Sequence, residues 1–417
     1  MGQIERPEAA WYGEGDHRQR RLTALRENGL DALLALTPEN AEYLSGRAST
    51  IATLWRTPAL VAVAVNTADD VVASTGDNEF AALDPELAGR FAHPLWIEHL
   101  DLRTVPPGPL AQRVAAARAD GDLGRPSQFD PSAMLDAAAA AVRVAVPAGG
   151  RVGTELAMLP VWVEDGLRLR LPGIDFVEAD PIFAALRAIK DPVEIARLRL
   201  AAELTEIGIA AVRDALRPGM SVVGVSAAYQ TAIWRHAADD ERFAALRDVE
   251  GLPTIGDGSG PTQVEPGQTV KLDMQVDIGG YHSDLGRTYA LEPTADQQAA
   301  HAALLAALDA VTAAARPGVT FHTLWEIGIG SMREAGFANY SRGHLGHSVG
   351  LAQNYEEPPF VAADETRPLA PGMVLSLEVP WYLLGVGAFQ LERMVLITAS
   401  GHERLDTLPD DLAVVRS

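Results

Sequence analysis

The chain has 417 residues, 47% of them hydrophobic and 22% charged, which is the composition of a globular protein long enough for two domains. A net charge of −22 argues against a nucleic-acid ligand, and the absence of cysteine excludes disulfides and thiolate metal sites. Because the start is polar and no apolar run approaches about 18 residues, we expect no secretory signal, no membrane association and a cytoplasmic protein.

The first half of the chain alternates helical and strand patterns. A helix is predicted to end near Asn28-Gly29, where an apolar strand follows. Residues 58–66 and 69–75 read as two further strands, and the alanine-rich residues 131–146 as a helix that breaks before a strand at 150–156. This alternation predicts an N-terminal α/β domain over residues 1–182.

The second half, residues 183–417, opens with a helix start at Asp191-Pro192. Long helices are expected around 200–215 and 297–315. Two hairpin patterns, at 270–291 and 373–398, both carry acids inside apolar strands, which suggests a duplicated architecture.

The acids of these hairpins have a regular placement. Asp273 and Asp284 are eleven residues apart across a turn at Gly279-Gly280, and Glu378 and Glu392 are fourteen apart across a second turn. A hairpin brings its two strands side by side, so we expect the carboxylates of each pair to meet.

Between the hairpins lies the glycine-rich stretch RGHLGHSVGL, which contains His344 and His347. A buried, unpaired carboxylate is costly, so four carboxylates and an imidazole in apolar sequence call for cations. Hard divalent ions take carboxylate oxygens, and an imidazole ligand favours Zn, Mn, Fe or Co over Ca.

These acids also have a simpler interpretation than metal binding. A single acid on a strand is more often solvated or ion-paired than a metal ligand. Arg287 and Arg393 lie close in sequence to Asp284 and Glu392 and are candidate ion-pair partners for them. The ordered set of two acid hairpins and a glycine-flanked histidine favours the metal.

Four segments in this order, LDMQVDIGGYHSDLGRTYAL, GHSVGL, LAPGMVLSLEVPWY and FQLERMVLIT, resemble the pita-bread metallopeptidase superfamily of methionine aminopeptidase, aminopeptidase P, prolidase and creatinase. The first 180 residues resemble the creatinase/prolidase N-terminal domain. The resemblance implies an α+β fold: a C-terminal pita-bread catalytic domain of duplicated αβ units with a curved antiparallel sheet, after an N-terminal α/β creatinase-like domain.

Position by position, the resemblance makes Asp273 a chelating ligand of one metal, while Asp284 and Glu392 bridge two metals and His347 and Glu378 complete the second. Glu378 is then the candidate general base, acting beside a metal-bridging hydroxide. The expected cofactor is two divalent ions, with Mn favoured and Co, Zn or Fe also suited to the ligands.

The sequence departs from the proline-directed members outside the ligand set. Asn354 stands where they carry a second histidine, Gln390 stands where an arginine is expected, and an upstream histidine is missing. We expect His344, in its glycine-rich loop, to line the pocket and contribute to catalysis, and Asn354 and Gln390 to contact substrate. His282 and Tyr355 are weaker candidates for the same role.

The sequence supports three hypotheses for the function of the protein. The leading one is a metal-dependent hydrolase of the Xaa-Pro aminopeptidase/prolidase group, which cleaves an amide bond in a short peptide. The missing histidines favour an alternative, a non-peptide enzyme such as an ectoine- or creatine-type amidohydrolase or a sulfoniopropionate lyase. A non-enzymatic binding protein is disfavoured because all five ligand positions are kept. The resemblance also implies a homodimer whose N-terminal domain caps the partner's pocket.

Overall fold

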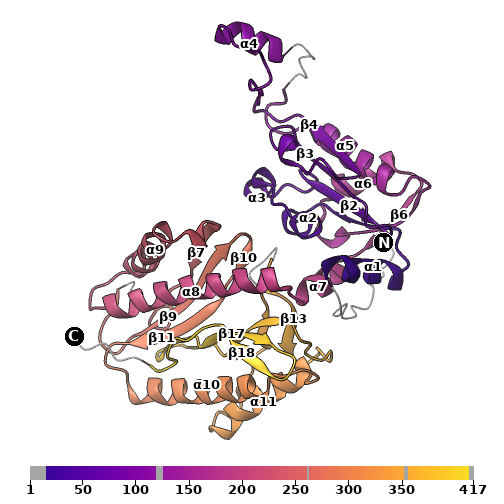
Figure 1. Ribbon diagram of the computed structural model, residues 1–417. Coiled ribbons are helices and arrows are strands. Elements are labelled where there is room, and N and C mark those ends of the chain that lie inside the picture. Colours follow the sequence, from indigo (N-terminus) through magenta and orange to yellow (C-terminus); the bar gives the residue numbers. More distant parts are fainter. Residues whose placement is uncertain (1–15, 119–124, 261–262, 352–355, 413–417) are drawn as a thin grey trace. The chain divides into compact units, whose positions relative to one another are not determined.

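The computed structural model describes residues 16–118, 125–260, 263–351 and 356–412. The chain divides into two compact units, residues 1–183 and 184–417, each with its own sheet (Figure 1). In the described part of the chain, no helix is both long enough and apolar enough to cross a membrane.

The N-terminal unit is built on a six-stranded mixed sheet in the order β4-β3-β2-β1-β5-β6. Its strands are β1 (Ala32–Ala35), β2 (Ala62–Asn66), β3 (Val71–Gly76), β4 (Gly89–His93), β5 (Gly150–Thr154) and β6 (Ile174–Glu178). Strand β2 runs antiparallel to β1 and β3, whereas the pairs β1–β5, β5–β6 and β3–β4 are parallel.

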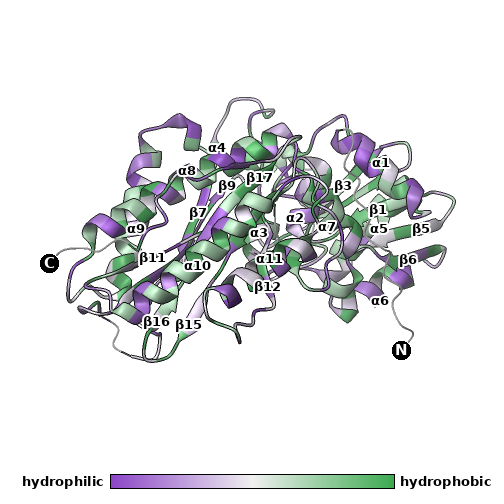
Figure 2. Ribbon diagram, turned by 90° about the horizontal axis from the view of Figure 1, so that it is seen from below, coloured by the Kyte–Doolittle hydropathy of each residue, from purple (hydrophilic) through white to green (hydrophobic). Residues whose placement is uncertain are grey.

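This unit also contains helices. They are α1 (His17–Glu27), α2 (Pro38–Ser45), α3 (Thr50–Trp55), α4 (Leu110–Ala117), α5 (Pro131–Ala145), α6 (Val161–Arg170) and α7 (Asp180–Ala188), the last of which crosses into the second unit. Helix α5 packs against β2, β3 and β4. Most of its alanines are buried. Because its residues are largely apolar, α5 appears green in Figure 2, whereas the arginine-rich α1 appears purple.

Local sequence explains where these helices begin and end. The Asp16 side chain accepts a hydrogen bond from the Gln19 amide at the start of α1, and Gly29 follows its end in the left-handed conformation (φ 59°). Asp130 caps α5 in the same way as Asp16, with Pro131 in the first turn. The helices and strands predicted for this half are therefore confirmed, with β1 shorter than its apolar run.

The C-terminal unit contains a ten-stranded antiparallel sheet. Along its main path the order is β10-β9-β11-β17-β14-β12-β13, and β7, β8 and β18 pair at its sides. The strands are β7 (Leu246–Gly251), β8 (Thr254–Ile255), β9 (Thr269–Ile278), β10 (Tyr281–His282), β11 (Leu285–Ala290), β12 (His344–Ser348), β13 (Glu357–Ala362), β14 (Val374–Glu378), β17 (Glu392–Ile397) and β18 (His402–Arg404). A small separate hairpin, β15 (Trp381–Leu383) and β16 (Gly387–Phe389), joins β14 to β17.

Each half of this sheet has its own pair of packed helices. Helices α8 (Pro192–Ala215) and α9 (Val222–Ala238) pack together, and α8 contacts β9 and β11. Helices α10 (Ala295–Ala314) and α11 (Phe321–Glu334) also pack together and contact β12, β13 and β14 (Figure 1). The unit thus repeats a hairpin with two helices, as the two acid hairpins suggested.

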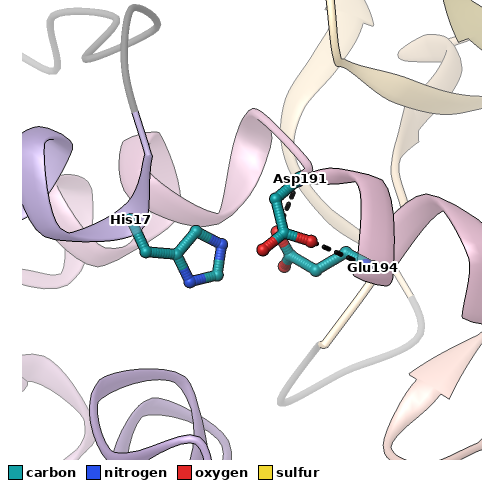
Figure 3. A group of neighbouring side chains, drawn as sticks. All are labelled: His17, Asp191 and Glu194. Carbon is teal, nitrogen blue, oxygen red and sulfur yellow. Dashed lines mark hydrogen bonds between the residues drawn. The ribbon is translucent and has the colours of Figure 1, made fainter.

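The first turn of α8 is held by a capping box. The Asp191 side chain accepts a hydrogen bond from the Glu194 amide, and the Glu194 side chain accepts one from the Asp191 amide (Figure 3). His17, also labelled in Figure 3, belongs to the N-terminal unit. The Tyr281 hydroxyl donates to the other oxygen of Glu194, which ties α8 to the hairpin carrying the first two acids.

Candidate metal centre

Three of the acids lie in one row across neighbouring strands. Asp273 on β9 pairs with Gly286 on β11, Gly286 pairs with Glu392 on β17, and Glu392 pairs with Glu378 on β14. Paired residues of antiparallel strands direct their side chains to the same face, so the three carboxylates share one face of the sheet. A Cβ at Gly286 would lie 2.1 Å from Gln390 and 3.0 Å from Glu392, so glycine makes room for the row.

His347 and Asp284 belong to the same face. His347 pairs with Ser376, two residues before Glu378, and a two-residue step along a strand keeps the same face. The Nε2 atom of His347 lies 3.7 Å from Asp284 Oδ2 and 4.0 Å from Glu392 Oε1. Each of the three residues, which we call the inner group, is buried and offers one ligand atom within 4.8 Å of the others.

The inner group has the properties of a cation site. Asp284 Oδ1 is buried and has no hydrogen-bond partner among the described residues. Burial raises the pKa of both Asp284 and Glu392 well above the usual range, and the charges of neighbouring carboxylates, including Asp273 and Glu378, raise it further. A divalent cation would satisfy the unpartnered oxygen and relieve this repulsion, so the residues present fit a metal.

Glu378 is held at both oxygens. Arg342 Nη2 donates to its Oε1 over 2.8 Å, and Gln390 Nε2 donates to its Oε2 over 3.0 Å and to Glu392 Oε2 over 3.1 Å. Burial by itself would raise the pKa of Glu378, but Arg342 together with His347 and His344 outweighs burial and lowers it. Glu378 is therefore an ionised carboxylate within the site.

Asp273 has a different partner. Its Oδ2 accepts a hydrogen bond from the buried ammonium of Lys271 over 2.9 Å, and its side chain is 22% exposed. Burial would lower the pKa of Lys271, but the charge of Asp273 outweighs burial and raises it, so Lys271 is a cation. The side chains of Lys271 and Asp273 lie on the same face of the sheet because the two residues are two positions apart on β9.

His344 lies at the edge of the group and opens onto a cavity. Its Nδ1 is 3.3 Å from Glu378 Oε1 and its Nε2 is 3.4 Å from Glu356 Oε2. The cavity has a volume of about 420 Å³, and Glu356, Asp364 and Glu365 are among the residues that line it. Burial lowers the pKa of His344, which favours the neutral ring.

Other residues considered from the sequence are placed elsewhere. His282 pairs with Asp277, with 3.8 Å between His282 Nε2 and the Asp277 carboxylate, and Asp277 accepts a hydrogen bond from the Gly280 amide in the hairpin turn. Asn354 and Tyr355 lie outside the described residues. Gln390 lies between the two glutamates, where its amide contacts their carboxylates.

The two arginines considered as ion-pair partners of the acids have other partners. Arg287 Nη2 lies 2.7 Å from Asp406 and 3.0 Å from Asp410, and Arg393 Nη2 lies 2.6 Å from Asp410 and 2.7 Å from Asp309. Their charges are therefore satisfied by other acids, and the alternative in which they pair with Asp284 and Glu392 is wrong.

Sequence reasoning missed Lys271 and Arg342, the two cations that contact the candidate ligands. Strand parity was a usable signal for Lys271, which stands two residues before Asp273. Arg342 precedes β12 in a loop, and no local pattern links it to Glu378, 36 residues further on.

With the geometry in place, three similarities define the class of protein. The model of metallopeptidase family M24 matches residues 196–399. YkvY of Bacillus subtilis is 30% identical over 247 residues, which are 58% of this chain and 67% of YkvY. The Xaa-Pro dipeptidase of Pyrococcus furiosus is 28% identical over 233 residues, which are 55% of this chain and 66% of that protein. The alignments thus span about two thirds of each relative.

A similarity of fold extends over nearly the whole chain. The crystal structure of dipeptidase PepE from Mycobacterium ulcerans superimposes with a TM-score of 0.71 at 22% identity, covering 97% of this chain and all of that one. The predicted α+β fold with a pita-bread domain is therefore confirmed. The chain belongs to metallopeptidase family M24, a family of metal-dependent peptide hydrolases, and the family implies divalent metal ions.

Proposed function

We propose that this chain hydrolyses an amide bond in a short peptide, in the manner of the Xaa-Pro aminopeptidase and prolidase group. The observation that carries the proposal is the buried inner group, in which carboxylates repel each other and Asp284 Oδ1 lacks a partner among the described residues. The divalent ions would be held by Asp273, Asp284, His347, Glu378 and Glu392. When bound, they would lower the pKa of a water molecule and polarise the scissile carbonyl.

The protein's own part in the reaction centres on Glu378. As an ionised carboxylate it is suited to accept a proton from the attacking water, and the hydrogen bonds from Arg342 and Gln390 fix its orientation. His344 lies 3.3 Å from the same carboxylate and reaches the cavity, so we propose that it carries a proton toward the departing amine.

The proposed substrate class rests on relatives and on size. One relative is named an Xaa-Pro dipeptidase and one structural neighbour a dipeptidase. A cavity of about 420 Å³ next to His344 suits a small ligand such as a peptide of two or three residues. Manganese as the metal, a homodimer and a cytoplasmic location remain proposals from the sequence.

The test is a peptide panel. Full-length protein reconstituted with Mn²⁺ is assayed on Xaa-Pro dipeptides, dipeptides without proline and Xaa-Pro-Xaa tripeptides, with chelator-treated protein alongside. We expect chelator-sensitive cleavage, and we expect Glu378→Gln to reduce kcat by about 100-fold or more because the base is lost. Glu326→Gln, at an exposed glutamate of α11, is the matched control and should leave kcat unchanged.

The role of Glu378 as the base and the peptide substrate are tested independently. An active Glu378→Gln variant would remove Glu378 as the base. Metal-loaded protein that cleaves none of the peptides would overturn the peptide substrate and direct the search to non-peptide amides, cyclic amidines and sulfonium acids.

A further inference from the structure

The cavity beside His344 has an acidic wall. It has a volume of about 420 Å³, and three of the described residues that line it are acids, Glu356, Asp364 and Glu365. None of the described lining residues is a lysine or an arginine. All of them belong to the C-terminal unit, so the cavity is a feature of that unit by itself.

The three acids differ in how their charge is balanced. Arg367 Nε donates to Glu365 Oε1 over 2.8 Å, so Glu365 has a cationic partner. Glu356 Oε2 lies 3.4 Å from His344 Nε2, and the Glu356 side chain is 52% exposed. Asp364 is exposed and makes no hydrogen bond or ion pair with the described residues. Glu356 and Asp364 therefore give the cavity a negative charge at neutral pH.

The cavity lies on the side of the site from which the amine would depart. His344 Nδ1 is 3.3 Å from Glu378 Oε1, and His344 is the proposed proton donor to that amine. The ring of Phe360 also lines the cavity, with its centre 5.3 Å from that of the His344 ring. A group that follows the scissile bond would thus meet an aromatic ring and two acids, and these are surroundings that favour a guanidinium or an ammonium.

We propose that this cavity recognises a basic residue, arginine or lysine, on the leaving side of the scissile bond. The proposal rests on the proposed function for the role of His344. A cleft lined by charges of one sign attracts a group of the opposite sign. A free carboxylate at the same place would lie beside acids, with no lysine or arginine among the described lining residues to bind it. Peptides with a free carboxylate there should therefore be poorer substrates than their amides.

The kinetic test compares peptides that differ by one charge. Ala-Arg-NH2 is compared with Ala-citrulline-NH2, and Ala-Pro-Arg-NH2 with Ala-Pro-citrulline-NH2, because citrulline is an uncharged isostere of arginine. For full-length protein loaded with Mn²⁺, we expect kcat/KM to be at least about threefold higher for the arginine peptide, mainly through a lower KM. A smaller ratio would overturn the proposal.

Two variants locate the effect. Asp364→Asn removes an exposed acid that has no partner among the described residues, and it should bring the ratio of the two kcat/KM values toward one. Asp296→Asn, at an exposed position in the first turn of α10, is the matched control, because it removes the same charge from a chain of net charge −22 outside the cavity. It should leave the ratio unchanged. Equal ratios in the two variants would show that the cavity is not the cause.

Binding without hydrolysis separates this inference from the proposed function. N-acetylargininamide and N-acetylcitrullinamide are titrated into the full-length protein and followed by NMR. We expect the arginine compound to bind at least about threefold more tightly, and we expect Asp364→Asn to remove the difference. A protein that shows this difference and cleaves no peptide would retain the cation site while the peptidase assignment fails. A protein that cleaves peptides and binds both compounds equally would overturn the inference and leave the proposed function intact.

Discussion

Gln390 shows how one side chain can organise two carboxylates. Its amide nitrogen donates to Glu378 Oε2 and Glu392 Oε2, and its backbone amide donates to the Thr288 hydroxyl on β11. Ser376 adds a hydrogen bond to the other oxygen of Glu392. Two acids that would otherwise repel each other are thereby held with their oxygens in fixed places, which a metal site requires.

Replacing Gln390 with leucine should remove both hydrogen bonds while keeping a side chain of similar size. We expect a loss of about 10- to 100-fold in metal affinity or kcat, the usual effect of removing a group that orients metal ligands. Calorimetry with Mn²⁺ and the peptide assay measure the two quantities. Gln298→Leu, at an exposed position on α10, is the control, and equal behaviour of the two variants would deny Gln390 this role.

The segment after β18 carries two acids that pair with three arginines, and we call these five residues the clamp. Asp406 and Asp410 in this segment contact Arg287, Arg393 and Arg404. Arg287 is fully buried and also donates to the backbone carbonyl of Glu392 over 2.6 Å. Burial would raise the pKa of Asp410, but the three arginines outweigh burial and lower it. The clamp thus supports the strand that carries a candidate ligand.

Asp410→Asn should lower the free energy of unfolding by about 3 kcal/mol at neutral pH, because it removes one of the two acids that neutralise the buried Arg287 and the buried partner of Arg393. Asp309→Asn removes the exposed partner of Arg393 and should cost at most about 1 kcal/mol. Denaturant unfolding of both variants measures the difference, and equal losses would contradict a special role for the buried acid.

The same clamp predicts a dependence on pH. Because the pKa of Asp410 is lower in the folded state, its stabilisation is present above the unfolded value of about 3.9 and is lost as pH falls through the folded value. The stability difference between the unaltered protein and Asp410→Asn should therefore shrink below about pH 4. A difference that stays constant down to pH 3 would rule out this titration.

The two compact units should respond differently to metal. All five candidate ligands lie in residues 184–417, so Mn²⁺ binds the folded form of that unit alone. Free metal at about 100 times its Kd adds about 2.7 kcal/mol to the stability of the unit that binds it. Calorimetric melting with and without chelator should move only one transition, and a shift of both would show that the units unfold together.

Local pattern in the sequence was sufficient for part of the elements, among them the strands that carry the acids. Strand parity, the Gly279-Gly280 turn and the cap at Asp191 each depend on neighbours within a few residues. The tertiary structure decided the partners: Arg287 turns to the clamp, Arg342 to Glu378, and Gln390 to two acids at once. Such contacts follow from the strand order β9-β11-β17-β14-β12, which joins residues about a hundred positions apart and which periodicity within a strand does not encode.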